Sequence, residues 1–348
     1  QRMDDIGDSL RETILNENVE LLISNKIHPT ALPNGFVPVD IDVTPMDNSK
    51  SQKEGVSRTY KGFDGYAPMM AYIGTEGYAI NFELREGKQH CQNGTVEFLQ
   101  ETIRLCKKLT DQPLLVRLDS GNDSIDNIAV LIDAGCYFII KRNLRRESKD
   151  GWFDMAKQYC KNITTPRDGK TVYVGSDWKV VCSKQFEKEF TLRAGYEITE
   201  RTVDKYGQIL LIPEIEVETW WTNLGATDEE IIQLYHAHGE CEQFHSEIKT
   251  DMDLERLPSG KFATNALVLE LGLIAYNILR MIGQGTIGGR APRQKRNVKR
   301  RRLHTVISNL IMMASHVTTH ARQLVMGLGK SNVWRHLFAN YCESSVAV

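Results

Sequence analysis

The sequence predicts an α/β fold: a mixed β-sheet with helices on both faces, interrupted by an all-β insertion domain and followed by a helical C-terminus. Three observations lead to this fold class. Strand and helix periodicities alternate over residues 36–149, β-type segments fill residues 150–223, and helical periodicity returns at Thr227. The chain has 348 residues, 41% hydrophobic and 25% charged, which is ordinary for a globular protein of two or three folded units.

The first predicted strand covers residues 36–43 and alternates strictly between apolar and other side chains. The apolar side chains share one face: Val37, Val39, Ile41 and Val43. Because successive side chains of a strand point to opposite faces, Asp40 and Asp42 lie together on the other face. This strand therefore presents two acids on the same side of the sheet.

The segments that follow predict the rest of a mixed sheet. They are a hairpin over 67–73 and 78–85, a helix over 93–106, a strand over 114–119, a helix over 125–132 and a strand over 136–142. A strand, a helix and a strand within about 30 residues form a parallel crossover unit. The order of three strands, then helix, strand, helix and strand, is that of a ribonuclease H-like fold.

The pattern changes after residue 149. Short β-type segments with charged breaks cover 171–174, 179–182, 189–194, 209–212 and 216–222, which predicts an all-β insertion. A capping box formed by Thr227 and Glu230 then begins a helix that runs to about Lys249. A very apolar helix covers 262–282, and a last helical stretch begins at Leu303.

We therefore expect five regions. They are an N-terminal helical segment over 1–35, a first part of the catalytic domain over 36–149, a β-rich insertion domain over 150–223, a second part of the catalytic domain over 224–285, and a basic linker with a helical region over 286–348. The chain starts at Gln1 rather than Met, so we expect the first segment to be the remnant of a longer N-terminal region.

Several protein classes are disfavoured by composition. No run approaches the roughly 20 apolar residues of a membrane span, and the first residues lack a signal-peptide pattern. The seven cysteines are scattered and contain no CxxC pair, and His90 and His245 have no partners at zinc spacing. We expect a cytoplasmic protein without a membrane partner, a disulfide scaffold or a zinc site.

The C-terminal part of the chain is strongly basic. From Thr286 onward there are eleven Lys and Arg residues and one acid, and eight of these cations fall within 290–302. Such a run is typical of a protein that binds a polyanion, because each neutralised phosphate releases counterions. We expect the block Lys299, Arg300, Arg301 and Arg302 to contact DNA backbone; the alternative is a solvated linker.

The helix after the insertion carries polar side chains at helical spacing. Tyr235, His238, Glu242, His245 and Lys249 follow one another at intervals of 3, 4, 3 and 4 residues, which places them on one stripe. One interpretation is an ordinary solvent-exposed face. The other is a face that handles phosphate, with Glu242 as a metal ligand and the other side chains on DNA backbone oxygens.

Three carboxylates converge if the predicted sheet is correct. Asp42 and Asp119 end neighbouring strands, and the helix with Glu242 packs beside them. Such a set can hold two divalent ions about 3.5 to 4 Å apart for an in-line displacement at a phosphodiester. Oxygen ligands suit Mg²⁺, and Mn²⁺ can substitute. Asp40 is the alternative first ligand.

These motifs resemble those of the DDE transposases of bacterial insertion sequences, in the group with a β-rich insertion before the catalytic Glu. The family's helix signature is Tyr, two residues, Arg, three residues, Glu, six residues, Lys, and this chain has Tyr235, His238, Glu242 and Lys249 at those intervals. The other matching pieces are Asp42-Val43-Thr44, Lys53-Glu54-Gly55, Tyr60, Gly62, Gly65, Tyr66, Pro68, Arg117-Leu118-Asp119-Ser120-Gly121 and residues 257–266. His238 in place of Arg is the departure, and an imidazole is charged only part of the time near neutral pH.

The resemblance implies an activity and a set of roles. Asp42, Asp119 and Glu242 are then the catalytic metal ligands for two Mg²⁺ ions, with cleavage at the transposon terminal inverted repeats and attack of the freed 3′-hydroxyl on target DNA. Tyr235, His238 and Lys249 contact DNA, and Trp220 or Trp221 stacks on a flipped base. The resemblance also implies a homodimer in the synaptic complex and a bacterial, nucleoid-associated location. The alternatives are a ribonuclease H-like metal nuclease that cuts without joining, and a non-catalytic DNA-binding descendant of a transposase.

Overall fold

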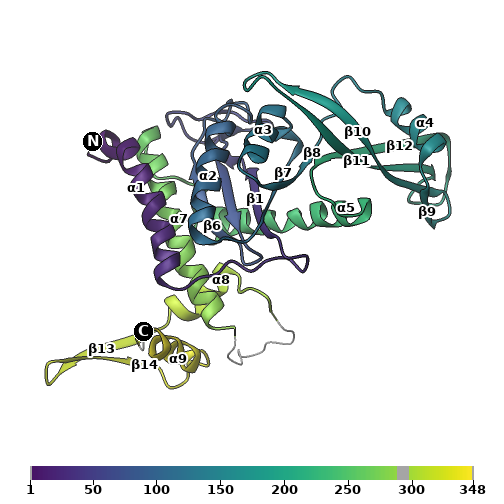
Figure 1. Cartoon of the computed structure of the whole chain (residues 1–348). Helices are drawn as coiled ribbons and strands as arrows, with labels where there is room; N and C mark the ends of the chain where they lie inside the picture. The colour runs from purple at the N-terminus through teal and green to yellow at the C-terminus, as the bar shows by residue number, and fades with distance from the viewer. Residues whose placement is uncertain (1, 288–297, 347–348) are drawn as a thin grey trace.

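A nine-stranded sheet forms the centre of the protein, which we describe from a computed structural model of residues 2–287 and 298–346 (Figure 1). In spatial order its strands are β6 (Tyr78–Glu83), β5 (Met69–Ile73), β1 (Val37–Val43), β7 (Leu114–Leu118), β8 (Tyr137–Lys141), β12 (Ile209–Thr222), β11 (Lys188–Val203), β10 (Lys170–Ser183) and β9 (Asn162–Arg167). A small second sheet contains β2 (Met46–Asp47), β4 (Asp64–Tyr66) and β3 (Ser57–Arg58).

The half of the large sheet that contains β1 has strands in both directions. β5 runs antiparallel to β1 and β6, whereas β7 runs parallel to β1 and β8. The register between β1 and β7 pairs Asp40 with Arg117. Side chains two residues apart share a face, so Asp42 and Asp119 follow this pair at the carboxyl ends of the two strands. The predicted mixed sheet is confirmed.

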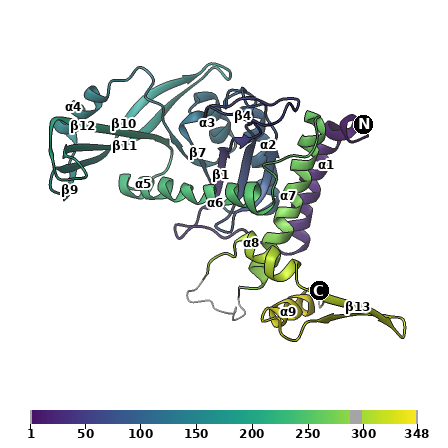
Figure 2. The same ribbon diagram turned by 180° about the vertical axis from the view of Figure 1, so that it is seen from behind.

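Helices cover both faces of the sheet. Their bounds are α1 (Arg2–Ser24), α2 (Thr95–Leu109), α3 (Ile125–Asp133), α5 (Asp228–His236) and α7 (Phe262–Gly285). α2 and α3 lie on one face, and α5 crosses the other, where Ile231 and Ile232 pack near Trp220 (Figures 1 and 2). α1 and α7 lie side by side next to β6.

α7 is long and apolar enough, by length and composition, to cross a membrane. Its polar side chains nevertheless bind to other buried groups of the protein. The amide of Asn277 donates to Asn18 Oδ1 over 2.8 Å and accepts from the backbone N–H of Ala79 over 2.8 Å. Arg280 is fully buried and pairs with the buried Glu247. These contacts make α7 a core helix of this fold.

Residues 150–223 differ from the predicted all-β insertion. Helix α4 (Lys149–Tyr159) opens this region and buries Trp152, Phe153 and Ala156. The spacing of these three residues fits one face of a helix, which the strand-based interpretation overlooked. The four strands β9 to β12 extend the large sheet, because β12 pairs antiparallel with β8.

The C-terminal region is not wholly helical, which corrects the sequence expectation. After α8 (Leu303–Val306), a hairpin of β13 (Ser315–His320) and β14 (Gln323–Leu328) precedes α9 (Arg335–Val346). Ala321 and Arg322 join the two strands with φ values of 49° and 63°. A two-residue turn in which both residues have positive φ matches the twist of a hairpin, and Gly or Asn usually occupies these two positions. Because Ala and Arg stand there instead, the sequence did not indicate a hairpin.

Candidate active site

Asp42 and Asp119 lie at the carboxyl ends of two neighbouring parallel strands, β1 and β7. Burial and the charge of Asp119 raise the pKa of Asp42 to about 7 from an ordinary 3.8. The backbone N–H of Val43 donates to Asp42 Oδ1 over 2.7 Å, and Asn122 Nδ2 donates to Asp119 Oδ1 over 2.7 Å. Two close carboxylates repel each other, so this position favours a cation or a retained proton.

Asp40, the alternative first ligand, is occupied within the protein. Arg117 Nε and Nη2 donate to its two carboxylate oxygens over 2.6 and 2.7 Å, and His238 Nδ1 lies 2.9 Å from Oδ1. Burial alone would raise the pKa of Asp40, but Arg117 and His238 outweigh it and hold the pKa at about 2. Its oxygens are therefore committed to a buried ion pair, which favours Asp42 as the acid that is free for a ligand.

Each residue of the network of Asp40, Arg117 and His238 precedes one of the three predicted acids in the sequence. Asp40 precedes Asp42 by two residues on β1, and Arg117 precedes Asp119 by two residues on β7. His238 precedes Glu242 by four residues, which is one helical turn. Arg117 Nη1 also donates to the backbone carbonyl of Leu234 in α5 over 2.7 Å. The network thus connects β1 and β7 to α5 and to the 3₁₀ turn before α6.

The predicted polar stripe is not one exposed face. α5 is followed by a 3₁₀ turn (Ala237–Glu240), helix α6 (Cys241–Ser246) and a π turn (Glu247–Asp251), and each change of hydrogen bonding rotates the side chains that follow. His238 and His245 are consequently buried. His238 was expected to contact phosphate. In the structure it bonds to Asp40 inside the protein instead, which corrects that expectation.

His245 faces the acid pair from the helix. Its Nδ1 lies 3.9 Å from Asp42 Oδ2. Burial, together with the nearby cations His238 and Lys249, lowers the pKa of His245 to about 3. The imidazole is therefore neutral at physiological pH, and it brings no positive charge to the acids.

Glu242 is exposed on α6, which contacts β1. Within residues 2–287 and 298–346, its carboxylate does not form a group with Asp42 and Asp119 in which all ligand atoms lie within 4.8 Å of one another. The structure thus brings together two of the three predicted acids and places the third on an adjacent helix. The catalytic assignment of Glu242 stays a prediction.

Two tyrosines lie near the acid pair. Burial, followed by the charges of Asp119 and Asp42, raises the pKa of Tyr235. The same causes raise the pKa of Tyr60, whose hydroxyl donates to the carbonyl oxygen of Val43 over 3.4 Å. Both phenols therefore stay protonated and can donate hydrogen bonds beside the acids.

A pocket of about 500 Å³ opens next to Asp119. Its wall includes Tyr60 and the basic side chains Arg58, Lys88 and His90. Sequence reasoning did not identify this pocket, because its wall comes mainly from three separate segments, residues 58–60, 87–91 and 119–121. Its signals in the sequence were Tyr60 and the Asp119-Ser120-Gly121 segment among the family motifs.

Both tryptophans predicted to stack on a base are internal. Trp220 is fully buried against α5, and Trp221 is 4% exposed. Trp221 Nε1 donates to Asp123 Oδ1 over 3.0 Å, and the guanidinium of Arg142 lies 4.2 Å from its ring centre. Neither side chain offers a free ring face, which corrects the expectation. Trp178 on β10 is 64% exposed.

The predicted DNA-contacting lysine of the helix also has internal partners. Lys249 Nζ donates to the carbonyl oxygen of Pro45 over 2.9 Å and lies 3.6 Å from Glu255 Oε1. The side chain is 24% exposed. Lys249 therefore joins the helix to the segment after β1, and a DNA contact by it stays a prediction.

The basic C-terminal block is mostly folded onto the protein. Arg300 Nη2 donates to Gln243 over 2.9 Å, Arg301 is buried and donates twice to Thr286, and Arg302 pairs with Asp251 over 2.9 Å. The three arginines therefore correct the expectation that all four side chains face DNA. Lys299 is exposed and, among the described residues, has no ion-pair partner. The predicted cations Arg290, Arg293, Lys295 and Arg296 lie outside the described residues.

The sheet and the acids define the class: an α/β protein with a carboxylate pair where neighbouring parallel strands end. The family model for the transposase DDE domain, group 1, matches residues 7–345. The chain therefore belongs to the DDE transposase family, which confirms the resemblance drawn from its motifs.

A cryo-EM structure of a piggyBac transposase synaptic complex with hairpin DNA is similar at 11% identity and a TM-score of 0.39. The match covers 91% of this chain and 55% of that one, so this chain spans just over half of the length of that transposase. No curated protein matches the sequence.

Proposed function

We propose that this protein cleaves phosphodiester bonds at the ends of a transposable element and joins the freed 3′-hydroxyl to target DNA. Membership of the DDE transposase family supports this function. The observation that carries it is the pairing of Asp42 with Asp119: burial, and then the charge of Asp119, raise the pKa of Asp42 to about 7. An uncompensated pair of this kind is a typical mark of a functional site.

We also propose a finer description of the fold. The strand order β6-β5-β1-β7-β8, with β5 antiparallel to its neighbours, fits a ribonuclease H-like sheet. Residues 150–223 are then an insertion that begins with α4 and lengthens the sheet. Under this interpretation, the regions 36–149 and 224–285 form one catalytic domain.

The residues at the sheet edge fit divalent metal ions. Asp42 and Asp119 offer closely spaced, partly desolvated oxygen ligands, which suit Mg²⁺ and also accept Mn²⁺. We assign Glu242 as the third ligand, because its helix contacts β1 and its carboxylate is exposed. When bound, the metal ions supply Lewis acidity for phosphate oxygens and lower the pKa of an attacking water.

The side chains around the acids have supporting roles in this proposal. Tyr235 and Tyr60, both protonated, donate hydrogen bonds to phosphate or sugar oxygens. Lys299 and Lys249 contact the DNA backbone. The partners are the terminal inverted repeats and target DNA, bound by a homodimer in a bacterial cytoplasm.

A strand-transfer assay tests this function against its alternatives. The substrate is labelled DNA from the region that flanks the coding sequence, incubated with the full chain, Mg²⁺ and a circular target. We expect both a cleaved strand and a joined product. Cleavage without joining would indicate a metal-dependent nuclease, and binding without cleavage would indicate a non-catalytic DNA-binding protein.

A further inference from the structure

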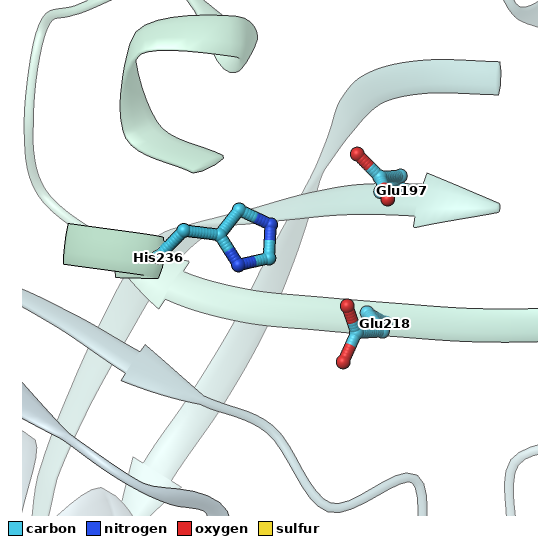
Figure 3. A group of neighbouring side chains, drawn as sticks. All are labelled: Glu197, Glu218 and His236. Carbon is cyan, nitrogen blue, oxygen red and sulfur yellow. The ribbon is translucent and has the colours of Figure 1, made fainter. Parts of the chain in front are cut away.

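A second cluster of possible metal ligands lies on the sheet face covered by α5. It consists of Glu197 on β11, Glu218 on β12 and His236, the last residue of α5 (Figure 3). Their ligand atoms all lie within 4.8 Å of one another. We propose that these three side chains bind a first-row divalent cation of the Zn²⁺ type, separate from the Asp42 and Asp119 pair.

The two glutamates create an electrostatic cost that a cation would relieve. Glu197 and Glu218 are directly opposite each other in the antiparallel pair of β11 and β12, and like charges in this arrangement destabilise a sheet. Lys141 pairs with Glu218 Oε1. Glu197 has no ion-pair partner in the part of the chain that the structure describes. One carboxylate of the pair is therefore without a counter-charge.

The ligand types select the kind of cation. An imidazole nitrogen with two carboxylates suits Zn²⁺ better than Mg²⁺, which prefers an all-oxygen shell. Three protein ligands can bind zinc when a water molecule fills the fourth position. The ligands come from two strands and a helix end, so binding needs only side-chain rotation. Figure 3 shows the three side chains extending toward the same space.

The surroundings of the cluster resemble the outer shell of a metal site. Lys141 contacts only one oxygen of Glu218 and leaves Oε2 for a cation. The ring of His236 lies 6.2 Å from that of the buried Trp220 and 6.3 Å from that of Tyr235, which shield one side. Outer partners that orient a ligand and an apolar wall that limits water are usual around bound metals.

A cation at this position would join α5 to β11 and β12. His236 immediately precedes the 3₁₀ turn that leads to Glu242, so the cation would fix the start of that turn relative to the strands of the 150–223 region. This role is structural. It does not depend on the catalytic assignment of Asp42, Asp119 or Glu242.

Calorimetric titration with Zn²⁺ tests the proposal. The parent is the full chain with Asp119→Asn, which weakens metal binding at the acid pair. The test variants add Glu197→Gln or His236→Asn, and the matched control adds Glu216→Gln, a change of another β12 glutamate that pairs with Arg201. We expect one Zn²⁺ per parent chain, and an affinity at least about tenfold weaker in both test variants but unchanged in the control. Mg²⁺ at equal concentration should not displace Zn²⁺.

Thermal unfolding provides the second measurement and shows whether each variant is folded. Zn²⁺ should raise the Tm of the parent and of the control, but not of Glu197→Gln, because a ligand stabilises only the state that binds it. An absence of Zn²⁺ binding by the parent, or equal affinity in parent and test variants, would overturn the proposal. Strand transfer by the wild-type chain is measured independently, so failure here leaves the proposed function unaffected.

Discussion

His238 Nδ1 lies 2.9 Å from Asp40 Oδ1 in the interior of the protein. This contact joins the 3₁₀ turn that precedes the helix of Glu242 to the strand that carries Asp42. Arg117 completes the connection, because it binds Asp40 and the carbonyl oxygen of Leu234. The imidazole of His238 thus ties the 3₁₀ turn before α6 to the central sheet.

Asp40→Ala should destabilise the protein strongly. The change leaves Arg117 and His238 buried without their shared acceptor, and loss of one partner of a buried pair costs about 3–5 kcal/mol. The free energy of unfolding in urea measures this effect. The control is Asp64→Ala, which breaks an exposed pair with Arg58 and should cost less than about 1 kcal/mol. Similar losses for both variants would contradict the network.

The pair of His238 and Asp40 should make stability depend on pH. Burial alone would lower the pKa of His238, but the hydrogen bond and charge of Asp40 raise it above its ordinary 6.5. A raised folded-state pKa means that the stabilisation is complete below about pH 6.5 and is lost as pH rises through the folded pKa. His238→Asn should remove this alkaline decline in metal-free protein. Parallel stability curves for the two proteins would show that the pKa of His238 does not change on folding, against the raised value expected here.

Metal affinity at the acid pair should rise with pH. With the pKa of Asp42 near 7, a divalent cation must displace a proton below that pH. The apparent Mn²⁺ affinity should therefore increase roughly tenfold from about pH 6 to pH 8, with proton release. Calorimetry in buffers of different ionisation enthalpy measures both quantities. Asp42→Asn should bind weakly at every pH, whereas a flat wild-type profile would argue against Asp42 as a ligand.

Arg301 and Lys299 should affect different properties. Arg301→Gln breaks buried contacts to Thr286 and should lower the free energy of unfolding by about 1–3 kcal/mol. Lys299→Gln should leave stability unchanged and reduce the log–log salt slope of DNA binding by about 0.9, the value for one phosphate contact. Filter binding at several salt concentrations compares the two variants. An unchanged slope for Lys299→Gln would show that Lys299 is not on the DNA.

The strands and the acid pair were predictable because their signals are local. The alternation around Asp42 and the apolar segment that ends at Asp119 identify two strands, and the order of elements makes the strands neighbours. The partners of Asp40 were not predictable from local patterns. Which residues form a buried ion pair depends on how distant segments of the chain align with each other in the fold. The segment around His238 was predicted as one regular helix with its polar side chains on one face. In the structure a 3₁₀ turn and a π turn interrupt it, so these side chains point in different directions.

The Asp119→Asn variant tests most directly whether Asp42 and Asp119 hold the metal ions for DNA cleavage. The amide keeps the shape of the side chain but removes its charge. Cleavage of labelled element-end DNA in Mg²⁺ should fall by several orders of magnitude, while DNA binding, measured in the same samples, should stay close to wild type. Retention of more than about a tenth of wild-type cleavage, a difference of only about 1.4 kcal/mol, would contradict the assignment.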